Sequence, residues 1–225
     1  MGADPTYKLM DKIENTSGVP QDEFQRAGLI DRLSQYLAAE PRAWHVRYNL
    51  ALTLNADGHP EEALKQFRLV LADSPKHLES LINIGGIHLS RGEADLALKA
   101  FTNALSAWDV PLVRANLAVA YLQLGHLEQA EKELKRALGQ NPQMVEAWTN
   151  LGTVLMHRGR LKESIAAGEE ALKLAPDFAL AHNNLAAAYL ERGDRDKARG
   201  HALKARELGY PVSETLLEEL EVSKT

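Results

Sequence analysis

Five glycines recur at almost constant spacing along this chain of 225 residues. Gly58, Gly92, Gly125, Gly159 and Gly193 are separated by 34, 33, 34 and 34 residues, and each lies in a short polar stretch. A period of this length is typical of arrays of stacked supersecondary units. The chain therefore repeats one structural unit five times, and this repeat constrains its fold more than any other feature.

Each copy contains two apolar-periodic segments joined through its glycine. A small residue follows the glycine by five places, as at Ala63, and Leu or Ile precedes it by eight, as at Leu50. Apolar residues three and four places apart predict an amphipathic helix on either side of the turn. Pro75, Pro142 and Pro176 end three of the copies, since proline disfavours helix at the residue before it. The five helix-turn-helix units occupy residues 44–77, 78–110, 111–144, 145–178 and 179–212.

The fourth copy shows the pattern most completely, with Trp148, Gly152, Ser164 and Pro176 at their repeat places. W, L and G, then S or A, then A and P at these spacings resemble the tetratricopeptide repeat (TPR) family. The resemblance covers residues 44–212 and implies an all-α protein, a right-handed α-solenoid of helix-turn-helix repeats with capping helices.

One departure from the pattern affects packing. The fourth copy has Gly168 where the first two copies have Phe67 and Phe101. Because interiors are close-packed, either a neighbouring side chain fills that space or a void remains.

The two segments before the first copy differ in character. Residues 1–20 show no sustained period and are expected to be disordered. Residues 21–43 are predicted to form half a repeat, a second helix without its first partner, which caps the array. The apolar stripe of this helix runs through Phe24, Ala27, Ile30, Leu33 and Leu37.

The last segment, residues 213–225, is predicted to form a closing helix. Ser213 can cap its N-terminus, and its glutamates face water. Its leucines cover the last repeat, as the end of such an array requires. These leucines are Leu216, Leu217 and Leu220.

Composition narrows the class of protein. Hydrophobic residues make up 45% of the chain, which is enough for a sizeable core. The net charge of −5 has the wrong sign for a phosphate-binding surface, so we expect no nucleic-acid partner. Uncharged stretches are too short to span a membrane, and there is no cysteine for a disulfide or thiolate site. We expect a cytoplasmic protein that does not insert into membranes.

The sequence holds no recognisable catalytic, metal or cofactor motif. HExxH, P-loop, GxGxxG and GxSxG strings are absent, and the eight histidines never form an i,i+4 pair. Scattered surface histidine is the expectation for them, except for His88, which takes the place of Tyr121 and Tyr189 in other copies and is expected to be partly buried. We therefore predict no enzymatic activity, no metal site and no cofactor.

An asparagine recurs at the sixth place of every copy. Asn is a mediocre helix former, so its recurrence within a helix suggests inheritance or use. The family resemblance implies that this place faces the concave surface, where an asparagine ladder holds the backbone of an extended peptide. An amide suits this task because it can pair with a peptide N–H and C=O at once. The alternative is that Asn is simply common at this place in the family. The column comprises Asn49, Asn83, Asn116, Asn150 and Asn184.

The same helical face predicts the rest of a peptide-binding groove, apolar with amides and few charges. Glu79, Glu146 and Glu191 form its expected acidic rim, so the predicted ligand is extended and apolar with basic residues. The carboxylate clamp of some family members needs Lys and Arg, which this face lacks. The further lining residues are Tyr48, Leu52, Ile82, Leu89, Val119, Leu122, Thr153, Met156, Asn183 and Ala187.

The leading functional hypothesis is a non-enzymatic scaffold or adaptor that binds a peptide or protein segment in this groove. One alternative is a structural protein that assembles with itself, residues 21–40 or 1–20 docking on a neighbouring copy. The other is an auxiliary subunit of a larger enzyme complex.

Overall fold

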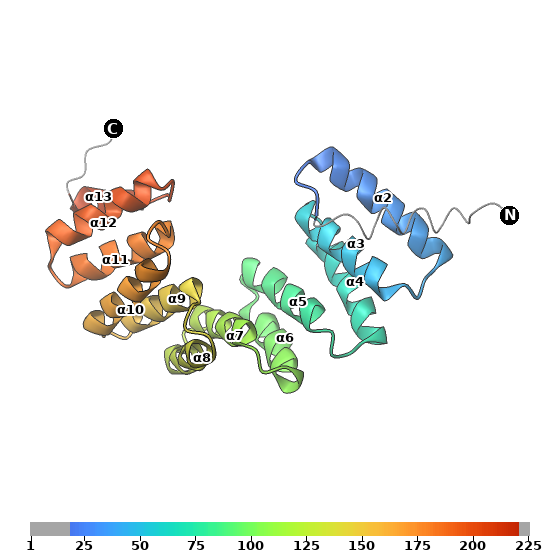
Figure 1. Cartoon of the computed structure of the whole chain (residues 1–225), viewed down its shortest axis with the longest axis horizontal. Helices are drawn as coiled ribbons and strands as arrows, with labels where there is room; N and C mark the ends of the chain where they lie inside the picture. The colour runs from blue at the N-terminus through green and yellow to red at the C-terminus, as the bar shows by residue number, and fades with distance from the viewer. Residues whose placement is uncertain (1–18, 221–225) are drawn as a thin grey trace. The chain divides into compact units, whose positions relative to one another are not determined.

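The computed structural model describes residues 19–220, and within that range it consists of twelve α-helices and no strand (Figure 1). The fold is all-α, as the periodicity predicted. Most of the predicted disordered tail, up to residue 18, and the last five residues of the predicted closing segment lie outside the described residues.

The chain divides into two compact units, residues 1–91 and 92–225, which are described separately. Unit 1 contains α2 (Glu23–Ala39), α3 (Trp44–Ala56), α4 (Pro60–Asp73) and α5 (Leu78–Ser90). Unit 2 contains α6 (Ala94–Ala107), α7 (Pro111–Gln123), α8 (Leu127–Gln140), α9 (Val145–His157), α10 (Leu161–Leu174), α11 (Ala179–Glu191), α12 (Arg195–Glu207) and α13 (Glu214–Glu219).

Unit 1 is a chain of helices in which each packs against the next, α2 on α3, α3 on α4 and α4 on α5. Its core includes Val46 and Leu50 from α3 and the fully buried Phe67 from α4. The predicted stripe of α2 is partly wrong, because Phe24 is 87% exposed and Ala27 is also exposed. Leu33 and Leu37 of the predicted stripe are buried, together with Leu29 and Tyr36, which the stripe did not include.

Unit 2 continues the same packing from α6 through α13, and α9 also contacts α7 and α11. The first helices of successive repeats therefore lie next to one another. One apolar cluster centres on α7 to α10, with Leu134 and Leu151 among its buried residues. A second joins α10 to α13 and includes Leu185, Ala198 and Leu220.

The five periodic glycines end the first helix of each copy in a left-handed backbone conformation. Their φ angles lie between 70° and 89°, a region that residues with a Cβ rarely adopt. After Gly125, the N–H of His126 donates to the carbonyl of Tyr121 at 2.9 Å, and after Gly159 that of Arg160 donates to Leu155 at 2.9 Å. These bonds satisfy carbonyls at the helix end, which explains the strict glycine period.

Small residues let the two helices of a copy approach closely. Ser164 Oγ on α10 donates to the carbonyl of Gly152 on α9 at 2.7 Å. A Cβ at Gly152 would lie 3.2 Å from the carbonyl oxygen of Ser164, closer than ordinary van der Waals contact. Ala118 and Ala130 hold the same two places in α7 and α8, and both are fully buried.

At the end of the described chain, α13 packs on α12 through leucines. Leu220 is fully buried, and its carbonyl accepts a 2.8 Å hydrogen bond from Arg199 Nε. Ser213 stands at the N-cap of α13, but its side chain makes no capping hydrogen bond.

Candidate peptide-binding face

The predicted lining residues all lie on first helices, in α3 and α5 of unit 1 and in α7, α9 and α11 of unit 2. Each of the fifteen is partly exposed, neither buried in the core nor fully in solvent. A half-exposed side chain can meet a ligand while its own helix stays packed. We call the part of this surface in unit 2 the asparagine face; it comprises Asn116, Val119, Leu122, Asn150, Thr153, Met156, Asn183, Asn184 and Ala187.

Two of the five column amides are already engaged within the protein. Asn184 Nδ2 on α11 donates to Thr153 Oγ1 on α9 at 2.9 Å. Asn83 Nδ2 on α5 donates to the Glu79 carbonyl at 2.7 Å and, more weakly, to Tyr48 Oη at 3.4 Å. These amides tie one first helix to the next, so the column is not uniform.

The other three amides are free in the part of the chain that the structure describes. Asn49, Asn116 and Asn150 are partly exposed, and no hydrogen bond within residues 19–220 engages their side chains. Asn116 and Asn150 lie on α7 and α9, which are in contact. The middle of the asparagine face thus presents two neighbouring, unengaged amides.

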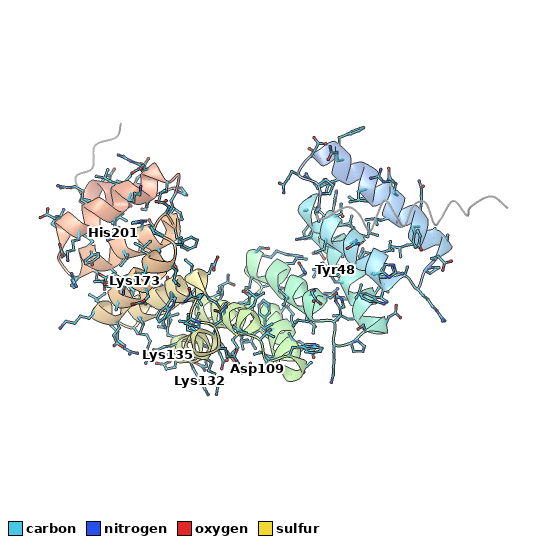
Figure 2. All side chains as sticks on the ribbon, in the orientation of Figure 1. Tyr48, Asp109, Lys132, Lys135, Lys173 and His201 are labelled. Carbon is cyan, nitrogen blue, oxygen red and sulfur yellow. The ribbon has the colours of Figure 1, made fainter. Side chains whose placement is uncertain are left out.

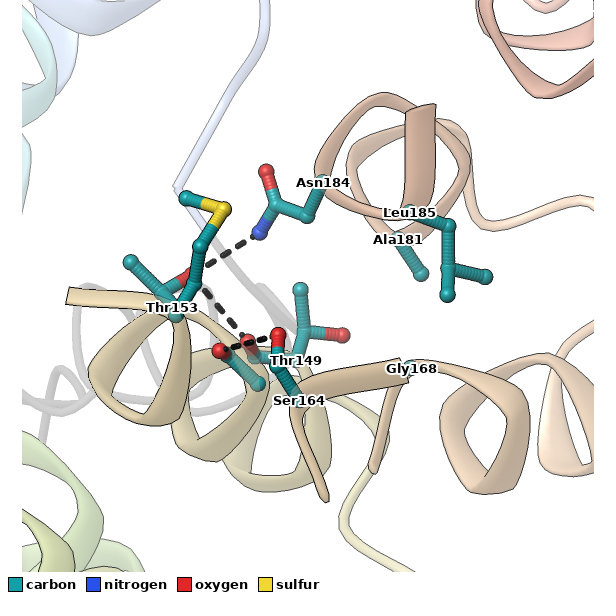
Figure 3. A pocket seen from close by; sticks show the side chains of 9 residues that line it. Thr149, Thr153, Ser164, Gly168, Ala181, Asn184 and Leu185 are labelled. Atoms are coloured by element: carbon teal, nitrogen blue, oxygen red, sulfur yellow. Dashed lines mark hydrogen bonds between the residues drawn. The ribbon is translucent and has the colours of Figure 1, made fainter. Parts of the chain in front are cut away.

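A narrow cleft opens beside Asn184, between α9, α10 and α11 (Figure 3). Thr153 and Met156 lie along it, and Gly168 and Leu185 line it as well. The space measures about 10 Å³, the room of a single water molecule. The cleft is therefore too small for a ligand side chain in this arrangement.

Leu185 explains why the cleft is small. A Cβ added at Gly168 would lie 2.8 Å from both Cγ and Cδ2 of Leu185. A neighbouring side chain from α11 thus fills the space that Phe67 fills in α4, and the void that the sequence left open does not form.

Most of the charge near α8 is committed to ion pairs rather than to a binding surface. Glu131 is 5% exposed. It accepts hydrogen bonds from Arg158 and from Arg160 at 2.8 Å, and it pairs with Lys135 at 2.6 Å. Burial by itself raises the pKa of Glu131, but the hydrogen bonds from Lys135 and Arg160 outweigh it and lower the pKa to about 2. Figure 2 labels Lys132 and Lys135.

The fourth place of the first helix has a recurring structural role that sequence reasoning missed. In three copies its side chain donates to the carbonyl of the proline six residues earlier. The donors are Arg47 at 2.6 Å, Trp148 at 2.9 Å and His182 at 2.9 Å. The sequence marks this place in every copy, since it always precedes a column asparagine by two residues.

His182 also pairs with His201 of α12, so the expectation of scattered surface histidines is wrong here. Because Nε2 of His182 donates to a carbonyl, its Nδ1 carries no proton in the neutral ring and accepts from His201 Nδ1 at 2.9 Å. Tyr189 stacks on His201 with ring centroids 5.4 Å apart. Burial, and then the charge of His182, lowers the pKa of His201. His88 is also buried, at 5% exposure.

Within residues 19–220, no group of three or more His, Asp or Glu side chains is placed to hold a metal ion. Among the helices of that range, none combines the length and apolar character needed to cross a bilayer.

Comparison with protein families decides which repeat this is. One family model, described as a tetratricopeptide repeat, matches residues 30–77, 56–110 and 115–177, and a second of the same description matches residues 167–200. The chain belongs to the tetratricopeptide repeat family. The resemblance and the fold class predicted from the sequence are therefore confirmed.

Several known proteins are similar over most of this chain. Protein FlbA of Caulobacter vibrioides is 34% identical over 157 residues, 69% of this chain and 26% of FlbA, so the chain spans about a quarter of that relative's length. The crystal structure of TTC0263, a thermophilic TPR protein in Thermus thermophilus, is 26% identical, with a TM-score of 0.65 over 80% of this chain and 97% of that one. YrrB, described as a TPR protein with an unusual peptide-binding site, is 19% identical with a TM-score of 0.63, over 84% and 97% of the two chains.

Proposed function

We propose that this chain is a non-enzymatic adaptor that binds an extended peptide segment on the asparagine face of unit 2. The TPR fold supports a role as a scaffold for protein–protein interaction. The observation that carries the proposal is the pair of unengaged amides, Asn116 and Asn150, on adjacent first helices. The similarity to YrrB, described as having a peptide-binding site, agrees in fold with this proposal.

The two central asparagines would hold the peptide by its backbone. Each side-chain amide offers a carbonyl acceptor and an NH₂ donor, which match the N–H and C=O of one peptide unit. Helices pack about 8–10 Å apart and an extended chain rises about 3.3 Å per residue, so neighbouring asparagines would contact positions about three ligand residues apart. Such contacts do not depend on ligand side chains.

The structure narrows the binding scheme that the sequence suggested. Five equivalent asparagines predicted a long, uniform ladder. Because Asn83 and Asn184 already have internal partners, a ligand must compete for their amides, and their net contribution falls. Hydrogen bonds to the peptide backbone would therefore come mainly from Asn116 and Asn150.

Side-chain preference would come from the apolar residues beside these amides. Val119, Leu122 and Met156 are partly exposed and can bury ligand methyl and methylene groups. Glu146 and Glu191 are exposed and favour basic residues in the ligand. We therefore propose a ligand that is apolar with basic positions and that binds less tightly as salt rises.

A displayed library of random 15-residue peptides, selected on the whole protein, provides ligands for a test. Each lost hydrogen bond is worth about 1 kcal/mol, so Asn116→Ala with Asn150→Ala should weaken unrelated selected peptides by similar factors of about 30. Leu122→Ala should instead change the ranking of the peptides. Isothermal titration measures both effects.

The matched control removes two exposed amides from second helices, Asn103→Ala with Gln129→Ala. It should leave every affinity unchanged. The proposal fails if the control and the asparagine variant behave alike, or if the library yields no ligand. Light scattering on the same samples tests the rival hypothesis of self-assembly, which requires an oligomer that forms with concentration.

A further inference from the structure

Unit 1 carries a cluster of aromatic side chains at the start of its first helices. Trp44 and Tyr48 of α3 both pack against His77, with ring centroids 5.2 Å and 5.1 Å from it. Tyr48 also packs on the buried Phe67 at 5.7 Å, and Figure 2 labels Tyr48 on this unit. Trp44 nevertheless remains 42% exposed. A large ring is thus held in place by its neighbours while part of it faces solvent.

A carboxylate lies beside these rings. Glu79, in the first turn of α5, has an oxygen 3.6 Å from His77 Nε2, and its side chain is 59% exposed. Burial, and then the charge of Glu79, raises the pKa of Tyr48, so the carboxylate acts on that ring as well. Among residues 19–220, no Lys or Arg pairs with Glu79.

The contact of His77 with this carboxylate is long, because the other ring nitrogen of His77 is committed to the helix cap. The backbone N–H of Ser80 donates to His77 Nδ1 at 3.2 Å as part of the cap of α5. Ser80 Oγ also lies 2.9 Å from Nδ1, so this nitrogen serves the helix cap, and only Nε2 faces the carboxylate, at 3.6 Å. The cluster therefore combines exposed aromatic surface with a carboxylate that no Lys or Arg among residues 19–220 pairs with.

We propose that Trp44, Tyr48 and Glu79 form a subsite that recognises an arginine side chain of a protein partner. A guanidinium group stacks on aromatic faces and pairs with a carboxylate through its planar donors, and both partners are within reach here. The negative charge of Glu79 favours arginine over an apolar side chain in this subsite. The proposal rests on the proposed function only in that the natural ligand is a protein segment.

The equivalent place in unit 2 provides a matched comparison. Glu146 holds the same position in α9 as Glu79 in α5, and it is also exposed. The first helix before α9 has Pro111 and Ala115 where α3 has Trp44 and Tyr48. The acidic residue recurs without the rings, so unit 2 is not expected to bind arginine at this place.

A small probe tests the subsite without any peptide ligand. N-acetyl-arginine amide is titrated into the ¹⁵N-labelled protein, with N-acetyl-citrulline amide as the uncharged isostere, and Trp44→Phe assigns the indole signal of Trp44. We expect that signal to move in a saturable way with the arginine compound only. The shift should be lost in Glu79→Gln and kept in Glu146→Gln.

The proposal is overturned if arginine and citrulline compounds shift the signal equally, if neither does, or if Glu79→Gln retains the response. An intact probe response without any peptide ligand would reject the proposed function alone. The reverse result would reject only the arginine subsite.

Discussion

Two neighbouring helix pairs of unit 2, α9–α10 and α11–α12, share a hydrogen bond near the start of the first helix but differ in the contact between the two helices. In α9 and α11 alike, the side chain at the fourth place donates to the carbonyl of a preceding proline, from Trp148 and from His182, each at 2.9 Å. Trp148 then joins an apolar cluster that includes Ala167 of α10. His182 instead meets His201 of α12.

The comparison separates a hydrogen bond that recurs from a contact that varies. A donor reaches the proline carbonyl in three copies, whereas the second copy has Leu81 at this place, so the bond recurs without being required by the repeat. The partner on the second helix can vary. The α9–α10 pair has Trp148 and Ala167 at this contact, whereas the α11–α12 pair has His201, whose pKa is lowered by burial and then by the charge of His182.

Removing the Trp148 side chain should have the largest effect on the free energy of unfolding. Trp148→Ala deletes packing in the α7 to α10 cluster and the bond to the proline carbonyl, and it should lower the free energy of unfolding by about 3 kcal/mol, the low end of the range for aromatic residues because Trp148 is partly exposed. Trp148→Phe keeps most of the packing and should cost about 1 kcal/mol. Urea unfolding measures both, and equal losses would contradict the division between packing and hydrogen bonding.

The charged network beside α9 and α10 should give the next largest effect. Glu131→Gln leaves Arg158 and Arg160 without their buried partner and should cost about 1–3 kcal/mol at pH 7. The pKa of Glu131 falls from 4.5 to about 2 on folding, so its contribution is complete above pH 4.5 and is lost as the pH falls toward 2.

The difference in stability between wild type and Glu131→Gln should therefore shrink across that acid range. Thermal or urea unfolding at pH 7, 4.5 and 3 checks this expectation. Glu62→Gln, at an exposed position outside this network, serves as the control. A constant difference across these pH values would mean that Glu131 acts through packing rather than through its charge.

The sequence predicted the helices well because their ends are encoded locally. Each periodic glycine is needed for a left-handed turn, and that requirement is written in every copy. The stripe of α2 was harder, since Phe24 and Leu29 are both apolar and lie on different faces of one helix. Which face is buried depends on α3, which the period of α2 alone does not reveal.

The exposure of the candidate face was predictable, but the engagement of its amides was not. All fifteen predicted residues are partly exposed, as expected for a surface face, and their role in binding stays a prediction. Whether an asparagine is free depends on side chains 31 or 35 residues away, Thr153 for Asn184 and Tyr48 for Asn83. The histidine pair was missed for the same reason, because its members are 19 residues apart and meet only after two helices pack.

A pair of glycine substitutions should give opposite results in α10 and α12. Gly168→Ala gains helix propensity of about 1 kcal/mol but forces Leu185 to move, and overpacking costs about 1–3 kcal/mol, so a net loss of about 1 kcal/mol is expected. Gly200→Ala meets no atom within 4 Å and should stabilise by up to about 1 kcal/mol. Melting temperatures of the two variants test this, and a gain for Gly168→Ala would show that Leu185 relaxes freely.

Replacing the two histidines of α11 and α12 by the residues found at the same places in α9 and α10 should give the smallest and most specific effect. The double variant His182→Trp with His201→Ala reproduces the contact between Trp148 and Ala167 and keeps a donor for the proline carbonyl. Burial, and then the charge of His182, holds the pKa of His201 below 6.5 in the folded protein, so the unfolded chain binds the proton more readily. Stability from this site is therefore complete above pH 6.5 and is lost as the pH falls below it.

Urea unfolding at pH 7.5 and pH 5.5 measures that loss directly. The wild type should lose stability between the two values, and the double variant should lose less, while His45→Gln at an exposed position should behave as the wild type. If the double variant keeps the whole wild-type pH dependence, the histidine pair is not its source, and the two helix pairs differ in packing alone.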